Sequence, residues 1–310
     1  MISIKEYSKD NYEEWNKFLV NAKNSLFMFN RDYMEYHSDR FCDNSLMFYE
    51  DDELIALLPL NKSNNALCSH GGLTFGGFVT NEKMRQHRMI ECFEVLKQYM
   101  KENNIQQLQY KVVPHIYHKI PAQEDLYALF KIGAELLKIE PTTTIMFSNP
   151  IKMKKGRKAQ ISRARREGVV VEESLDFDAF MAIESDVLKE KYSTKPVHTA
   201  EELKLLQSKF PDNIKMYVSK LNNEIIAGAV IFVYPNLVHT QYLGTTEKAR
   251  EIGALDLVIS EMINKYKDEK KFFDFGRSTE DDGKYLNEGL ISQKEGFGGR
   301  TIIHSTFVLK

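Results

Sequence analysis

Both halves of the chain repeat one order of predicted secondary-structure elements. In each half, the spacing of apolar residues predicts a strand, two helices, an antiparallel meander, a long helix and a further strand. A segment of this kind folds as an α+β domain, with a mostly antiparallel mixed sheet flanked by helices. A chain of 310 residues also exceeds the usual size of one domain. We therefore predict two tandem α+β domains related by duplication.

The boundary between the domains is predicted near Asn149 and Pro150. Proline biases the residue before it away from helix, and a basic segment follows. The first domain then spans residues 1–148, and the second spans residues 149–310. In the first domain, residues 45–60 are typical of a hairpin, because two apolar runs flank acidic turn residues.

The second domain begins with a dense cluster of positive charge. Residues 151–166 contain eight basic side chains and no acidic one. This pattern indicates either a solvated basic helix or an edge that binds phosphates of a nucleotide-sugar, coenzyme A or a tRNA acceptor end. Further on, Asn222 and Asn223 predict the turn of a hairpin. Helices are predicted at residues 84–100, 124–130, 177–191, 199–210 and 254–266.

Composition and charge exclude several classes of protein. Apolar residues at 43% and charged residues at 28% are ordinary for a globular protein, and the net charge of −2 argues against a general polyanion binder. We expect a cytoplasmic protein without membrane insertion, because the chain has neither a long apolar run nor a signal-peptide pattern at its start. The three cysteines lack metal-ligand spacing, so we expect reduced thiols, no metal and a core position for Cys92.

Residues 271–300 are the stretch most typical of a site. They begin with an aromatic strand in which Asp274 lies between phenylalanines, and they continue through a glycine-rich segment expected to be loop. Mixed charged and polar groups on glycine-punctuated loops are typical of binding and catalysis rather than of a core. The segment supplies three candidate substrate-binding residues, Ser278, Asn287 and Glu288.

The second domain combines, in this order, an antiparallel meander, Tyr242-Leu243-Gly244-Thr245, Arg250-Glu251-Ile252-Gly253, a helix and a strand. This order resembles the acetyltransferase fold of the GNAT superfamily. Three further runs, KGRKAQISRARREGVVVE, the FDFG strand end and EGLISQKEGFGG, resemble the Fem-like branch, whose members carry two such domains in tandem. The resemblance implies two tandem GNAT-like domains, with the reaction centre in the second.

The resemblance also implies a binding segment for acyl-coenzyme A. Its residues in this chain would be Tyr242, Leu243, Gly244, Arg250 and Gly253. The pyrophosphate loop of the superfamily reads Gln/Arg-x-x-Gly-x-Gly/Ala, and here Leu255 occupies the final small position. The chain therefore departs from the pattern at the point where coenzyme A would bind.

Acyl transfer to an amine needs a proton acceptor and donors aimed at the carbonyl oxygen. Asp274 in its apolar strand is a candidate base or orienting group, or else an acid that bonds loop amides. His239 is a candidate proton acceptor, since histidine titrates near neutrality, or else a satisfied core histidine. Lys294 corresponds to a lysine that contacts substrate phosphate or carbonyl in the resembling family; the alternative is a surface salt bridge with Glu295 or Glu288.

Other candidate substrate-binding residues lie near these groups in the sequence. Gln241 follows His239 at strand spacing, His198 lies in a short Pro-Val-His segment, and Lys158 belongs to the basic run. In the first domain, the glycine loop at residues 70–77 either borders an acceptor site or makes a plain turn.

The leading hypothesis is an N-acyltransferase that moves an acyl group from acyl-CoA to an amine by direct attack. The acceptor would be an amino sugar or another small-molecule or nucleotide-linked amine of a cell-envelope precursor. The alternative is a Fem-like transferase that uses charged tRNA and acts on a peptidoglycan precursor. A further alternative is a non-catalytic binding protein. We expect the protein to be a monomer.

Overall fold

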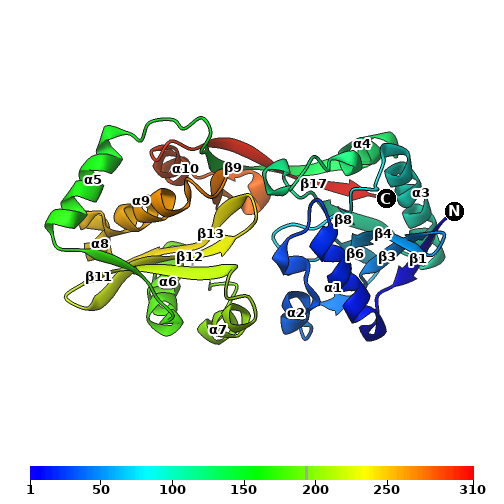
Figure 1. Cartoon of the computed structure of the whole chain (residues 1–310), viewed down its shortest axis with the longest axis horizontal. Coiled ribbons are helices and arrows are strands. Elements are labelled where there is room, and N and C mark those ends of the chain that lie inside the picture. The colour runs from blue at the N-terminus through cyan, green and yellow to red at the C-terminus, as the bar shows by residue number, and fades with distance from the viewer. Residues whose placement is uncertain (193–194) are drawn as a thin grey trace. The chain divides into compact units, whose positions relative to one another are not determined.

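A computed structural model describes residues 1–192 and 195–310, which form two compact units (Figure 1). Unit 1 consists of Met1–Glu140 with Ile303–Lys310, and unit 2 consists of Pro141–Ile302. The division falls within strand β9 (Glu135–Met146), before Asn149 and Pro150, near which the sequence predicts a boundary. The last residues of the chain belong to unit 1.

Unit 1 contains a four-stranded antiparallel sheet of order β1-β3-β4-β7. The predicted hairpin is present as β3 and β4, and Asp51 and Asp52 in its turn have positive φ values of 47° and 67°. Strand β8 pairs with Thr306–Leu309 at the end of the chain and continues through β6 and β5 to β2. The strands are β1 (Ile2–Glu6), β2 (Cys42–Asp43), β3 (Leu46–Glu50), β4 (Glu53–Leu58), β5 (Asn61–Ser63), β6 (Ala66–Cys68), β7 (Val79–Thr80) and β8 (Gln107–Lys111).

Helix α3 supplies much of the core of unit 1. Phe93 on this helix packs edge-on against Phe78, and Cys92 is fully buried beside it, as predicted. The helices of unit 1 are α1 (Tyr12–Asn21), α2 (Arg31–Met34), α3 (Gln86–Glu102) and α4 (Glu124–Lys131), with 3-10 turns at Lys9–Asn11, Phe27–Phe29, Glu35–His37 and His115–Tyr117.

Unit 2 is built on a sheet of order β10-β11-β12-β13-β14-β9. Strands β13 and β14 are parallel, and the other neighbours are antiparallel. The predicted asparagine turn joins β11 to β12, with positive φ values of 53° at Asn222 and 67° at Asn223. The strands are β10 (Val170–Glu173), β11 (Ile214–Leu221), β12 (Glu224–Val233), β13 (Leu237–Thr245), β14 (Phe272–Arg277), the short pair β15 (Thr279–Glu280) and β16 (Tyr285–Leu286), and β17 (Arg300–Leu309).

Helices cover both faces of this sheet (Figure 1). Helix α9 packs on β11, β12 and β13 and lies against α5, whereas α6 packs on β12 and β13 from the opposite face beside α7. The helices are α5 (Lys155–Arg166), α6 (Phe177–Tyr192), α7 (Ala200–Lys209), α8 (Glu247–Ile252), α9 (Ala254–Tyr266) and α10 (Glu288–Glu295), with a 3-10 turn at Asp281–Gly283. Among the helices of the described residues, none is long and apolar enough to cross a membrane.

Helix α10 corrects the expectation of a continuous glycine-rich loop after β14. Asn287 is its N-cap, with the side-chain oxygen accepting from the Leu290 amide at 2.9 Å. The local signal was present, because asparagine at a helix start and glycine at Gly296 after its end are ordinary helix boundaries. This helix matters for the site because it carries Lys294.

Candidate active site

The site lies where strands β13 and β14 separate. Their parallel pairing covers only Leu237–His239 with Phe272–Asp274. Beyond these residues β14 continues beside β9, while β13 stays with β12. A register shift between β12 and β13 leaves Gln241 opposite no residue of β12. Such bulges re-aim side chains and are common next to active sites.

His239 and Asp274 form a buried pair at the last point of this pairing. The Nδ1 atom of His239 lies 2.7 Å from Oδ2 of Asp274, whose side chain is fully buried. The other carboxylate oxygen, Oδ1, accepts hydrogen bonds from the hydroxyls of Thr142 at 2.6 Å and Thr144 at 2.8 Å. These donors explain how the carboxylate is tolerated in the core. They replace the loop amides that we considered as its partners.

The pair fixes the orientation of the imidazole. A carboxylate accepts only, so Nδ1 of a neutral His239 must carry the proton and Nε2 is then the basic nitrogen. Gly276 lies beside the ring with a φ of +71°. A Cβ atom at this position would come 3.1 Å from Cε1 of His239 and 3.8 Å from Nε2. Glycine therefore leaves space next to the ring as well as permitting the backbone conformation.

Lys294 approaches the same place from helix α10. Its side chain is 4% exposed, and its Nζ donates to the carbonyl oxygens of Gly276 at 3.0 Å and Arg277 at 2.5 Å. Burial lowers the pKa of Lys294 to about 8, against an opposing effect of Asp274, which raises it. Lys294 therefore does not form the surface salt bridge with Glu295 or Glu288 that was its alternative role.

Two buried hydroxyls near the end of the strand pairing have no hydrogen-bond partner among the described residues. They belong to Thr240, which follows His239, and to Ser278, which follows the carbonyls bound by Lys294. Buried polar groups are normally satisfied, so each exception needs an explanation. Both are available as donors to a bound molecule. Ser278 was predicted as a substrate-binding residue, whereas Thr240 was not.

His198 also reaches β13, on the face covered by α6. Its Nδ1 lies 2.7 Å from the hydroxyl of Tyr242, which also accepts from the His198 amide at 3.1 Å. Gly244 lies on the same face, close to Phe180 and Glu184 of α6. Leu243 points the other way and packs with the apolar cluster that includes α9. The residues predicted to bind coenzyme A therefore lie on both faces of the sheet.

The start of helix α9 is occupied by helix α5. Gly253 has a φ of +76°, and a Cβ atom there would lie 2.6 Å from the backbone oxygen of Gln160. Asp256, 4% exposed in the first turn of α9, accepts from Arg157 Nη1 at 2.9 and 2.7 Å. Leu255 is also buried, and Arg250 is exposed on α8. The helix start that commonly binds pyrophosphate is therefore covered by the chain itself.

The basic run forms helix α5 and the residues before it. Besides Arg157, one of its cations, Arg165, pairs with Glu261 at 2.7 Å. Lys158 is exposed, like most of the run. The exposed cations other than Arg165 are Lys152, Lys154, Lys155, Lys158, Arg163 and Arg166.

The remaining predicted residues have local roles in unit 2. Asn287, besides capping α10, donates from Nδ2 to Glu280 at 2.7 Å. Glu288 is exposed in the first turn of the helix. Gln241 is half-buried at the bulge. The structure thus brings His239, Asp274 and Lys294 to one place, and leaves Asn287 and Glu288 at the start of α10.

Unit 1 contains a glycine loop and a shallow surface hollow, and neither is built as a catalytic site. The predicted glycine loop packs on itself: Lys111 donates to the carbonyl oxygens of His70, at 2.7 Å, and Leu73, and a Cβ on Gly72 would collide with His37. A plain structural turn therefore accounts for this loop.

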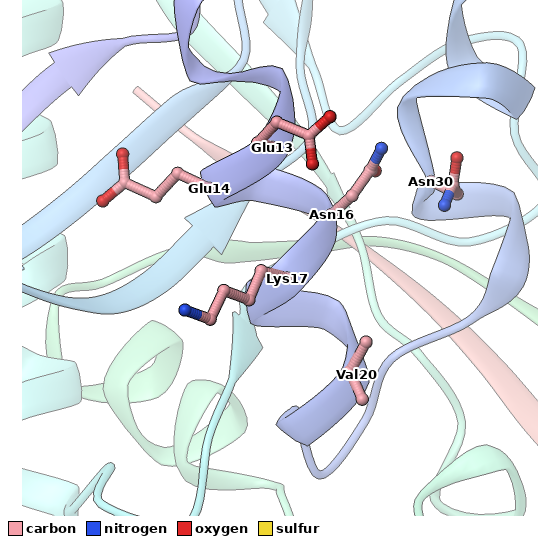
Figure 2. A pocket seen from close by; sticks show the side chains of 6 residues that line it. All are labelled: Glu13, Glu14, Asn16, Lys17, Val20 and Asn30. Carbon is pink, nitrogen blue, oxygen red and sulfur yellow. The ribbon is translucent and has the colours of Figure 1, made fainter.

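Figure 2 shows a shallow hollow beside α1, lined by the side chains of Glu13, Glu14, Asn16, Lys17, Val20 and Asn30. These side chains make no constellation suited to catalysis.

The comparisons with known proteins agree with this architecture. Residues 152–285 match the family described as the acetyltransferase (GNAT) domain, which confirms the predicted acyltransferase domain in the second half. No curated protein matches the sequence.

Solved structures match both units together. The crystal structure of FemX has a TM-score of 0.66 at 10% identity, over 98% of this chain and 96% of that one. L-PGS from Bacillus licheniformis has a TM-score of 0.62 at 14% identity, over 97% and 90%. A tandem GNAT protein from the clavulanic acid biosynthesis pathway has a TM-score of 0.56 at 11% identity, over 99% and 98%. The predicted fold of two tandem GNAT-like domains is confirmed.

Proposed function

We propose that this chain, whose second half matches the GNAT acetyltransferase domain and whose fold is similar to that of FemX, is an N-acyltransferase. Its reaction centre would lie at His239 and Asp274. One observation carries this proposal: a buried, fully hydrogen-bonded histidine–carboxylate pair at the point where two strands separate. Perturbed or buried acid–base pairs of this kind cluster at functional sites.

The pair suits the removal of a proton from an attacking amine. The neutral amine forms a C–N bond to the acyl carbon, and the positively charged nitrogen of the intermediate passes its proton to Nε2 of His239. Asp274 stabilises the resulting imidazolium through Nδ1, and Thr142 and Thr144 hold the carboxylate in place. Collapse of the intermediate breaks the bond to the leaving group, to which the imidazolium returns the proton. No covalent enzyme intermediate is required.

Two candidate donors for the developing oxyanion lie beside this pair. The hydroxyl of Ser278 is buried and has no partner among the described residues. Two of the three N–H groups of the Lys294 ammonium donate to the carbonyl oxygens of Gly276 and Arg277, and the third can donate to a bound molecule. Fixed donors of this kind stabilise negative charge most effectively when water is excluded. We assign Ser278 and Lys294 to the carbonyl oxygen, whereas Thr240, opposite Ile231, faces the α9 side of the sheet and is not assigned.

The geometry around α9 favours an aminoacyl-tRNA as the acyl donor over acyl-CoA. A coenzyme A pyrophosphate would need the helix start that Gln160 and the Arg157–Asp256 pair occupy. The exposed cations of α5 suit a long polyanion, which releases counterions on binding. The order of our two donor hypotheses is therefore reversed, and the acceptor stays an amine of a cell-envelope precursor, either an amino sugar or a peptidoglycan precursor.

Mass spectrometry of parallel reactions tests the donor. The protein is offered acetyl-CoA or a mixture of charged tRNAs, each with a panel of amino sugars, nucleotide-linked amino sugars and peptidoglycan precursors. We expect acylated acceptor only in the tRNA reactions, and no product with His239→Gln. Product from acetyl-CoA alone would reject the tRNA donor and restore the first hypothesis. If His239→Gln forms product at the wild-type rate, the proposed reaction centre is rejected. If wild type forms no product with any combination of donor and acceptor, a non-catalytic binding protein is favoured.

A further inference from the structure

Glu184 on helix α6 is a buried carboxylate outside the proposed reaction centre. Its side chain is 6% exposed, and Oε2 has no hydrogen-bond partner among the described residues. Burial raises the pKa of Glu184 to about 7. An isolated carboxylate in such a position destabilises the empty protein unless a ligand supplies its partner. Nothing in the residue pattern distinguishes Glu184 from the other acids of this helix.

The backbone of β13 is shaped to receive this carboxylate. A Cβ atom on Gly244 would lie 2.9 Å from Oε2 of Glu184 and 3.1 Å from the ring of Phe180. The next glycine across the sheet, Gly228, would meet the same ring at 2.9 Å. Two glycines therefore let α6 approach the strands closely, and Phe180 provides an apolar wall beside the carboxylate.

A polar group on the same face of the strand is also suited to a cation. Tyr242 is two residues before Gly244 on the same face, and its hydroxyl already binds His198. A phenolic oxygen and a carboxylate both accept hydrogen bonds, and an aromatic ring face attracts a cation. An ammonium group satisfies all three, whereas a phosphate or carboxylate would be repelled.

We propose that Glu184, with Phe180 and Tyr242, binds a primary ammonium group of the substrate that is distinct from the reacting amine. Gly244 lies five positions after His239, so at about 3.3 Å per residue the two points lie roughly 16 Å apart along the strand. A nitrogen held at Glu184 is thus too far from His239 to be the one acylated there. The substrate is therefore dibasic: either the aminoacyl donor carries a side-chain ammonium, or the acceptor is a diamine.

Binding can be measured without turnover. With ¹³C-labelled glutamate, the carboxyl signal of Glu184 is assigned by its loss in Glu184→Gln and titrated with and without n-butylammonium chloride. We expect the butylammonium ion to lower the pKa of Glu184 by at least one unit, whereas sodium chloride at equal ionic strength does not. An unchanged titration in the folded protein would overturn the proposal. Asp186→Asn, an exposed acid on the same helix, is the matched control and should leave the shift intact.

The turnover test rests on the proposed N-acyl transfer and separates the two sources of the ammonium. Donor arms compare lysyl-tRNA with Nε-acetyl-lysyl-tRNA, and acceptor arms compare a diamine with its mono-N-acetyl form. Wild type should prefer the charged member of one pair by at least tenfold, and Glu184→Gln should lose that preference while remaining folded. Equal preference in both proteins would overturn the inference. A butylammonium shift without turnover in any arm would leave the site standing and reject the proposed function.

Discussion

Asp274→Asn is the substitution that probes the proposed centre most specifically. It keeps the size and shape of the side chain but replaces the negative charge. The hydroxyls of Thr142 and Thr144 can still donate to the amide oxygen, at the places where they now bind Oδ1 at 2.6 and 2.8 Å. The amide nitrogen then faces Nδ1 of His239 and donates to it, so the proton moves to Nε2. Nε2 is then no longer a base, and no carboxylate stabilises the imidazolium.

The size of the effect follows from the role of the charge. An aspartate that orients a catalytic histidine is worth about 10⁴-fold in a serine-protease triad, and we expect a loss of about 10³–10⁴-fold, or roughly 4–5.5 kcal/mol of transition-state stabilisation. Single-turnover transfer, with thermal unfolding as the check on folding, measures it. Thr142→Val, which removes one hydroxyl donor, should cost about tenfold by the usual cost of one lost hydrogen bond. Transfer by Asp274→Asn within tenfold of wild type would refute the reasoning.

Three further predictions concern stability and binding. The pKa of Lys294 is lowered to about 8 in the folded protein, so between this pH and about pH 10.5 the unfolded state binds more protons than the folded state. The free energy of unfolding should therefore rise over this range by up to about 3 kcal/mol. Urea unfolding of Lys294→Met should lack that rise. Gly276→Ala should lose about 1–2 kcal/mol of stability, because its φ is +71°, and should slow transfer by crowding His239; a neutral result would contradict the packing. A Lys155→Glu/Lys158→Glu double variant should weaken tRNA binding about tenfold or more and flatten its salt dependence, whereas Lys101→Glu in unit 1 should not.

The sequence was sufficient for the fold because the elements of unit 2 have clear local signals. The asparagine turn and the helices at residues 199–210 and 254–266 all occur where the pattern placed them. His239 and Asp274 could also be selected, since each is a titratable group in an otherwise apolar strand. Their pairing is a matter of strand register, which the residues do not specify on their own.

The missed parts of the site depend on contacts between distant segments. Thr142 and Thr144 reach Asp274 only because β9 lies beside β14, and more than a hundred residues of chain separate them. Gln160 meets Gly253 through the packing of α5 on the start of α9. Local propensity contains no information on such approaches, so the covered helix start was not foreseen. It is this contact that changes the expected acyl donor.

The central claim is that His239 removes the proton from the attacking amine, and single-turnover acyl transfer by His239→Gln tests it most directly. The matched control is His118→Gln, which alters a buried histidine of unit 1 that bonds to the Val113 carbonyl oxygen. We predict that His239→Gln folds like wild type and transfers the acyl group at least about 10²–10⁴-fold more slowly, the range for loss of a general base, while His118→Gln stays within tenfold. Transfer by His239→Gln at a rate within tenfold of wild type would contradict the account.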